Sequence, residues 1–264
     1  MQSTENIQVQ LSEETTSYQD FFQVGSFEVG IFQEKKFPED SGENEDSLFL
    51  KHSSEGDILF AAVADGAGGH PRGAKASALA IEQCAENFSL PLFDIMKTAN
   101  KAILDLKAGA RSTLSMLRIL DDNLEFCSTG DSEMVHYNSK SKKLYSSLVH
   151  SPVGYQVEAG RIDQKSALEE EERHFLNHLL GDEFLRMSID LTEGIKRGHC
   201  IVIGSDGLFD NFTHRQIADI LFTEDFSSGF LHLCDLCKKR PEDSWLKIDD
   251  ISFIAIRKSE SSET

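Results

Sequence analysis

The chain has 264 residues, and 26 Lys and Arg against 45 Asp and Glu give it a formal net charge of −19. Such an excess of acid argues against a nucleic-acid-binding protein or one drawn to an anionic membrane surface, because both need clustered Lys and Arg. A hydrophobic fraction of 39% with 27% charged residues is typical of a soluble globular protein. No run of about 18 apolar residues occurs, so we expect no membrane-spanning segment.

The length suits one large domain or two small ones. Residues 1–24 are mostly polar and predict a loose leader, residues 25–258 a folded domain, and residues 259–264 a polar tail. The N-terminus lacks the basic start and apolar block of a secretory signal. Five cysteines at scattered positions, an odd number in a long chain, favour a reduced, cytoplasmic protein.

The first half of the domain predicts strands followed by two helices. Short apolar runs bounded by Gly, Asp and Ser predict strands at 26–33, 46–52 and 57–64. Residues 72–88 and 92–108 carry apolar side chains at helical spacing and predict two consecutive helices.

The second half predicts a meander of hairpins and then a mixed segment. The predicted strands cover 113–120, 123–130, 133–138, 143–149, 184–191, 199–205 and 251–258, and the predicted helices cover 214–222 and 226–239. Pro152, Gly154 and Gly160 predict a loop within residues 150–171, and the acidic run 169–172 predicts the start of a short helix that ends near Gly181. Strands in groups with helices in pairs favour an α+β fold of antiparallel sheets layered with helices.

One CxxC pair, Cys234 and Cys237 with His232 nearby, permits two interpretations. A zinc site normally needs a second pair of ligands at a recognisable spacing, and the sequence offers none. The pair lies in an apolar stretch at helical spacing, and cysteine is a favoured core residue. We therefore expect these side chains to pack in the core.

Acidic residues stand at the ends of several predicted strands. They are Glu45, Asp46, Asp65, Asp131, Asp206, Asp249 and Asp250. Any single Asp-Gly pair is most simply a turn, but carboxylates gathered at adjacent strand ends repel one another unless a cation neutralises them. Mg²⁺ and Mn²⁺ take oxygen ligands of this kind. The pattern predicts an oxygen-only site for one or two divalent ions and argues against zinc.

The same acids lie in a series of motifs that occurs in a known family. The motifs are NED at 44–46, VADGAGG at 63–69, STL at 112–114, GDS at 130–132, SDG at 205–207 and DDIS at 249–252. In this order and spacing the chain resembles the metal-dependent protein serine/threonine phosphatases of type 2C, and more specifically their compact bacterial branch. The resemblance covers roughly residues 25–258.

The resemblance implies a fold and a ligand set. The implied fold is a central antiparallel β-sandwich flanked by pairs of α-helices, a four-layer αββα arrangement with two metal ions, Mg²⁺ or Mn²⁺, at one end. Asp65 would bridge both ions, Asp206 and Asp249 would bind the first, and Glu45 and the carbonyl of Gly66 would bind the second.

Three further acids receive secondary roles from the resemblance. Asp46 would hold a metal-bound water, and Asp131 would help Asp206 to bind a third, weaker ion. Asp250 stands where the family usually has Asn, and we expect it to be a neighbour of the site and not a ligand.

The implied activity is hydrolysis of phosphoserine and phosphothreonine in a phosphorylated protein, the target of a cognate kinase. Two ions about 3.5–4 Å apart can share a water and lower its pKa from about 15.7 towards neutrality. The resulting metal-bridging hydroxide would attack phosphorus directly, while the ions shield the phosphoryl charge. No protein nucleophile is needed, and no cysteine stands in a phosphate-binding motif.

The chain departs from the family at the proton donor. Eukaryotic relatives have a histidine directly after the DG pair, where this chain has Ala67. We expect a metal-bound water to supply the proton, and His70 is the alternative.

It also departs at the phosphate anchor, where the family's arginine is replaced by Ser41. Arg72, Lys35 or Lys36 could substitute for it. The family's GDSR becomes GDSE, with Glu133 in place of the arginine.

Two other functions stay open on the sequence alone. The chain could be an inactive phosphatase-fold regulatory module, or it could act on a small phosphorylated metabolite. Residues 150–182 correspond to a flap beside the site in relatives, and we expect them to influence substrate choice.

Overall fold

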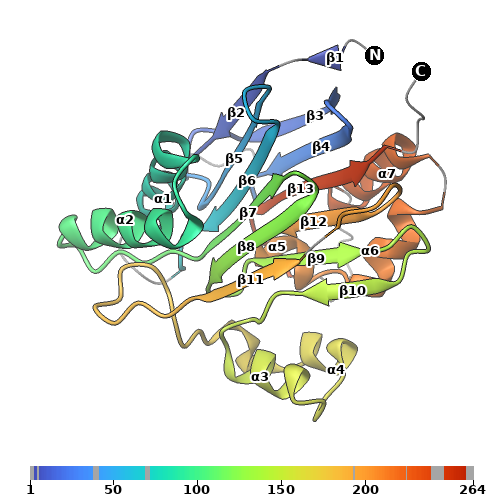
Figure 1. Ribbon diagram of the computed structural model, residues 1–264. Coiled ribbons are helices and arrows are strands. Elements are labelled where there is room, and N and C mark those ends of the chain that lie inside the picture. The colour runs from blue at the N-terminus through green and yellow to red at the C-terminus, as the bar shows by residue number, and fades with distance from the viewer. Residues whose placement is uncertain are drawn as a thin grey trace.

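Two β-sheets stacked face to face form the centre of the molecule (Figure 1). The computed structural model describes residues 3–4, 6–37, 42–68, 72–192, 194–223, 225–238 and 247–259. One sheet has the strand order β1-β3-β4-β13-β12-β9-β10, and the other has the order β11-β8-β7-β6-β5-β2. All neighbours pair antiparallel except β1 and β3.

The strand bounds follow the sequence predictions closely in the centre of each sheet. The seven-stranded sheet contains β1 (Ser3–Thr4), β3 (Ser17–Val24), β4 (Phe27–Glu34), β9 (Glu133–Tyr137), β10 (Lys143–Ser146), β12 (Cys200–Gly204) and β13 (Ile251–Lys258). The six-stranded sheet contains β2 (Ile7–Leu11), β5 (Asp46–Ser53), β6 (Ile58–Asp65), β7 (Leu114–Leu120), β8 (Asn123–Thr129) and β11 (Ser188–Thr192).

Helices cover the outer face of each sheet, as Figure 1 shows. The helices on the outer faces are α1 (Gly73–Asn87) and α2 (Leu92–Asp105) on one side, and α5 (Asp206–Phe209), α6 (His214–Leu221) and α7 (Phe226–Lys238) on the other. The short helices α3 (Pro152–Glu158) and α4 (Gln164–Leu168) lie at one end of the sandwich in Figure 1, and the 3₁₀ turn η1 (Glu171–His174) follows them in the chain. The pair α1 and α2 packs on the six-stranded sheet, and the pair α6 and α7 packs on the seven-stranded sheet. The predicted four-layer αββα sandwich is therefore confirmed.

In strand β13, side chains alternate between the two cores that this strand separates. Ile254 and Ile256 point into the core between the two sheets, while Phe253 and Ala255 point into the core under α6 and α7. Because successive side chains of a strand point to opposite faces, an uninterrupted apolar run is what a strand between two cores requires.

The prediction of a loose leader over residues 1–24 is wrong for its described part. Strand β2 pairs with β5, and strand β3 pairs with β4 along its full length. The sequence of β2 alternates apolar and polar residues, and its apolar Ile7, Val9 and Leu11 pack against the core between the sheets. Its polar residues mark the exposed face of an edge strand, not disorder.

The loop expected within residues 150–171 and the helix expected from Glu169 are also wrong. Pro152 begins α3, where a missing N–H costs nothing, and the Ser151 hydroxyl caps that helix by accepting from Gly154 N. The Asp163 carboxylate caps α4 in the same way. The acidic run forms only the single turn η1.

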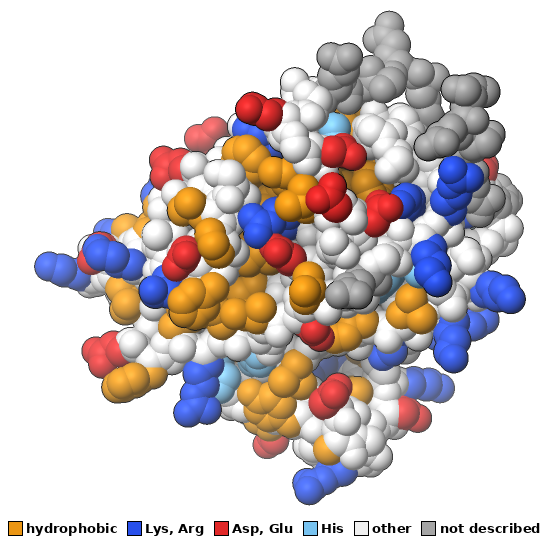
Figure 2. Space-filling view, viewed as in Figure 1, with side chains coloured by type: hydrophobic (Ala, Val, Ile, Leu, Met, Phe, Trp, Pro, Cys, Tyr) orange, Lys and Arg blue, Asp and Glu red, His pale blue; other side chains and the backbone are white. Residues whose placement is uncertain are grey.

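The five cysteines are free and buried, and the prediction of core packing for the CxxC pair is confirmed. Cys234 and Cys237 lie on α7 in the core beneath it, and burial raises the pKa of the Cys234 thiol above its ordinary value. Within the described part of the chain, no helix is long and apolar enough to span a membrane. Acidic and basic side chains interleave over the described part of the face in Figure 2, without a continuous basic surface.

Candidate metal centre

Acids from both sheets meet at one end of the sandwich. Glu45 and Asp46 introduce β5, and Asp65 ends β6 in the six-stranded sheet. Asp206 follows β12, and Asp249 precedes β13 in the seven-stranded sheet. A cavity of about 480 Å³ opens there, lined by the predicted ligands Glu45, Asp65, Gly66, Asp131, Asp206 and Asp249 together with Lys36, Thr113, His174 and Lys247.

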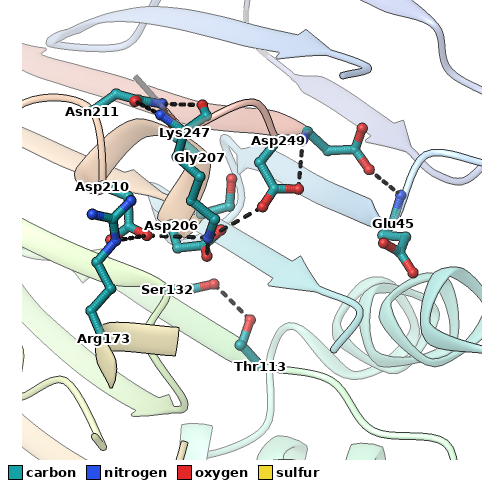
Figure 3. Close-up of polar contacts among 12 residues, drawn as sticks. Glu45, Thr113, Ser132, Arg173, Asp206, Gly207, Asp210, Asn211, Lys247 and Asp249 are labelled. Atoms are coloured by element: carbon teal, nitrogen blue, oxygen red, sulfur yellow. Dashed lines mark hydrogen bonds and ion pairs between the residues drawn. The ribbon is translucent and has the colours of Figure 1, made fainter. Parts of the chain in front are cut away.

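The STL motif fixes the backbone of Asp65. Thr113 Oγ1 accepts a hydrogen bond from Asp65 N at 2.9 Å, and Thr113 N donates to the Asp65 carbonyl at 2.8 Å. The same hydroxyl lies 2.6 Å from the Ser132 hydroxyl of the GDS motif (Figure 3). Three motifs that are distant in sequence are thus joined by one threonine.

Gly66 is required by a close approach of the backbone. A Cβ at Gly66 would lie 2.2 Å from the carbonyl carbon of Gly73 at the start of α1, which no side chain can satisfy. Gly66 N donates to the Glu45 carbonyl at 2.9 Å. The absence of a side chain therefore allows the backbone of Gly66 to lie beside Glu45. The Gly66 carbonyl and Glu45 need to be neighbours if they bind the same ion.

Asp46 and Asp250 lie behind the cavity and organise it. Asp46 pairs directly with Asp65 across β5 and β6, and its Oδ2 accepts from the Ser205 hydroxyl at 2.6 Å. Asp250 accepts from Lys36 N at 2.6 Å and from Glu45 N at 2.7 Å. As expected, Asp250 is a neighbour; it holds the segment that carries Lys36 and Glu45.

Crowding of carboxylates dominates one side of the cavity. Burial, reinforced by repulsion from Asp206 and Asp46, raises the pKa of Asp65 well above its ordinary value. Burial and Asp206 likewise raise the pKa of Asp131. Asp131 Oδ1 is buried and has no hydrogen-bond partner among the described residues. This oxygen-only, under-neutralised set fits a hard divalent cation.

A lysine neutralises the other side of the cavity, as Figure 3 shows. The Lys247 ammonium contacts Asp206 Oδ2, and it lies 3.1 Å from Asp210 Oδ2 and 3.2 Å from Asp249 Oδ2. Burial alone would lower the pKa of Lys247, but the attraction of Asp206, Asp210 and Asp249 outweighs it and raises the pKa above its usual range.

Side chains next to this lysine hold it in place. Asn211 donates to the Lys247 carbonyl at 3.0 Å and accepts from Lys247 N at 2.8 Å. Arg173 Nε, from η1, donates to Asp210 Oδ2 at 3.1 Å. The family motifs do not include these four residues, Arg173, Asp210, Asn211 and Lys247, and they were not predicted from the sequence. The one sequence feature that could have indicated them is the position of Asp210, one helical turn after Asp206.

The structure brings all the predicted ligands to one cavity but does not draw them into a closed cage. No group of three or more His, Cys, Asp or Glu side chains in the described ranges is positioned to hold an ion. Two lysines instead engage the acids: Lys247 as above, and Lys36, whose ammonium lies 3.1 Å from Glu45 Oε2 and 3.8 Å from Asp249 Oδ1.

The candidates for the phosphate anchor are separated by their positions. Lys36 lines the cavity, whereas Lys35 is only 3% exposed, and Arg72 is an exposed residue at the start of α1, outside the cavity lining. Ser41 and His70 lie outside the described residues.

Solved phosphatase structures share this architecture. The serine/threonine phosphatase PstP/Ppp of Mycobacterium tuberculosis superposes with a TM-score of 0.71 at 20% identity, over 89% of this chain and 99% of that one. A PstP catalytic domain solved with two manganese ions has a TM-score of 0.65 at 19% identity, over 97% of this chain and all of that one. These likenesses define the class of fold.

Sequence comparison identifies the family. Residues 39–247 match the profile of the protein phosphatase 2C family. A protein from Streptococcus pyogenes serotype M6, described as a putative protein phosphatase 2C-type, is 24% identical over 195 residues, which cover 67% of this chain and 78% of that protein. The chain belongs to the protein phosphatase 2C family, as the motifs predict.

Proposed function

We propose that this protein hydrolyses phosphoserine and phosphothreonine esters in proteins, with Mn²⁺ or Mg²⁺ as its cofactor. Membership of the protein phosphatase 2C family supports the reaction class. The observation that carries the proposal is the meeting of Glu45, Asp65, Asp206 and Asp249, from four strand ends in two sheets, around one cavity. The two manganese ions in the related PstP structure support the choice of cofactor.

The proposed ligands divide between two positions. Asp65 would be shared by both ions, Asp206 and Asp249 would serve the first, and Glu45 with the Gly66 carbonyl the second. Asp131 would contribute to a third, weaker position. When bound, the divalent cations supply an acidified water and shield the charge of the phosphoryl group.

The remaining residues of the site orient the reactants. We propose that the Lys36 ammonium, on the cavity wall beside Glu45, binds a phosphoryl oxygen of the substrate in place of the family's arginine. Asp250 holds the backbone of both Lys36 and Glu45, so it keeps the phosphate anchor and a metal ligand in register. Asp46 positions Ser205 directly before Asp206.

We further propose that the substrate is a protein phosphorylated by a cognate kinase in the cytoplasm, and that nucleic acid and membranes are not partners. The net charge of −19 supports this choice, because polyanions would be repelled. The related proteins give no support to the inactive-module interpretation, and absence of phosphate release under every condition of the test below would favour it.

The test is hydrolysis of a phosphothreonine peptide by protein first stripped with EDTA and then supplied with Mn²⁺ or Mg²⁺. We expect phosphate release to return only with the added ion, and to be lost in Asp65→Asn under the same conditions. Equal release with EDTA and with Mn²⁺ would contradict the proposed cofactor. Metal-dependent release from a sugar phosphate but not from the peptide would contradict the proposed substrate.

A further inference from the structure

The first metal position, as assigned under the proposed function, coincides with an ion pair inside the chain. The Lys247 ammonium contacts Asp206 Oδ2 and lies 3.2 Å from Asp249 Oδ2, which belong to the two side chains proposed to hold the first ion (Figure 3). A divalent ion bound by carboxylates lies about 2.0–2.6 Å from their oxygens. An ammonium in the same gap excludes it by volume and by charge.

The backbone of Lys247 is fixed beside this gap. Asn211, only 4% exposed, contacts both the N–H and the carbonyl of Lys247 and also donates to the Gly207 carbonyl at 2.7 Å. The tether ties Lys247 to the segment that carries Asp206. Because the ammonium cannot diffuse away, its effective concentration at the two carboxylates is high.

A third acid gives the ammonium a place that is not a proposed metal ligand. Asp210 Oδ2 lies 3.1 Å from the Lys247 ammonium and accepts from Arg173 Nε at 3.1 Å. A lysine that leaves Asp206 and Asp249 keeps Asp210 as a partner. Displacement is therefore a short movement between neighbouring acids and does not require the ammonium to leave the site.

We propose that Lys247 is a built-in competitor of the divalent cation: its ammonium occupies the first metal position in the metal-free protein, and an ion must displace it to bind there. The second position, at Glu45, Asp65 and the Gly66 carbonyl, lies outside its contacts. The protein therefore binds one divalent ion more weakly than its ligand set alone would allow.

The test is calorimetric titration of Mn²⁺ into metal-free wild-type protein and Lys247→Met, which keeps the length of the side chain and removes its charge. We expect the weaker Mn²⁺ dissociation constant to fall at least tenfold in Lys247→Met. Lys247→Arg, which restores a cation, should bind Mn²⁺ much as the wild type does.

The matched control is Lys258→Met. Lys258 pairs with Asp122 and the Ile195 carbonyl, away from the cavity, so this variant loses the same charge without touching the site. We expect its Mn²⁺ affinity to stay within about twofold of the wild type. An equal gain in both methionine variants would show a general effect of charge and overturn the proposal.

Thermal unfolding gives a readout that does not depend on turnover. Without metal, Lys247→Met should melt below the wild type because three acids lose one cationic partner, and Mn²⁺ should raise its melting temperature by more than it raises that of the wild type. If the wild type and Lys247→Met both bind Mn²⁺ with the same affinity, this inference alone is overturned. Absence of Mn²⁺ binding in both proteins would overturn the inference and the proposed function together.

Discussion

The two sides of the acidic cavity differ in how their charge is balanced. Asp65 and Asp131 form no ion pair with any described residue, and burial and mutual repulsion raise the pKa of both carboxyls. Asp206 and Asp249, which line the same cavity, share the ammonium of Lys247. Burial and repulsion from Asp206 also raise the pKa of Asp249, but the attraction of Lys247 and Lys36 offsets part of that rise. Both sides therefore carry crowded acids, and only the side of Asp206 and Asp249 has the Lys247 ammonium among them.

This difference teaches that a ligand set does not define a metal site by itself. The family motifs supply every proposed metal ligand, but the cations that compete for these ligands come from positions outside the motifs. The affinity for a divalent ion depends on the ligands and on the competing cations. An ion relieves the repulsion between Asp65 and its neighbouring carboxylates, but at Asp206 it must replace the ion pair with Lys247.

The largest expected effect is at Asp65. Asp65→Asn should lower kcat/KM for a phosphothreonine peptide with saturating Mn²⁺ by on the order of 10³-fold, the scale of losing a central electrostatic stabiliser. The same variant should raise the melting temperature of the metal-free protein, since it removes a buried, repelled charge. Loss of activity with a lower melting temperature would contradict the contrast between the two sides.

Lys36 should come next. Lys36→Met should raise KM for the peptide about tenfold with a smaller change in kcat, because a charge-assisted hydrogen bond to phosphate contributes about 1.5–3 kcal/mol. Steady-state kinetics with Lys36→Arg as the conservative control tests this, and the arginine variant should recover most of the loss. An unchanged KM in Lys36→Met would exclude Lys36 as the anchor.

Asp206→Asn should change stability in the opposite direction from Asp65→Asn. It removes one of three acids from a buried lysine, so we expect the metal-free protein to lose about 1–3 kcal/mol, less than for a pair with no other partner. Chemical denaturation of the two asparagine variants side by side measures the difference. Changes of the same sign would show that Lys247 does not neutralise this side.

The smallest effect lies outside the cavity and concerns pH. Burial, with a contribution from His199, lowers the pKa of His136 to about 4. The unfolded chain binds this proton near pH 6.5 and the folded chain does not, so stability should be full above about pH 6.5 and fall as the pH drops towards 4. In His136→Gln, the fall of the melting temperature over this pH range should be smaller by a few degrees than in the wild type. An unchanged fall would show that other groups cause the loss of stability.

Several features of the fold could be predicted because local sequence states them directly. The apolar run of β13 and the helical spacing of α1 required no tertiary information. The edge strand β2 was missed because its exposed face is polar, and α3 was missed because Pro152 and Gly154 occur at a helix start as readily as in a loop.

The sequence predicts the acids of the site but not the lysine that neutralises some of them. Asp65 and Asp206 each follow an apolar strand and precede a glycine, and this pattern identifies them in the sequence. Lys247 carries no such signal, because its position depends on the backbone contact with Asn211 and on the meeting of strand ends from both sheets.

The most direct test of the central claim is a crystal structure of the protein with Mn²⁺, with the ions located by their anomalous scattering. We predict manganese bound to an Asp65 carboxylate oxygen and the Gly66 carbonyl, and a second manganese between Asp206 and Asp249, with the Lys247 ammonium displaced towards Asp210. Manganese-saturated crystals in which no ion contacts Asp65 would contradict the account.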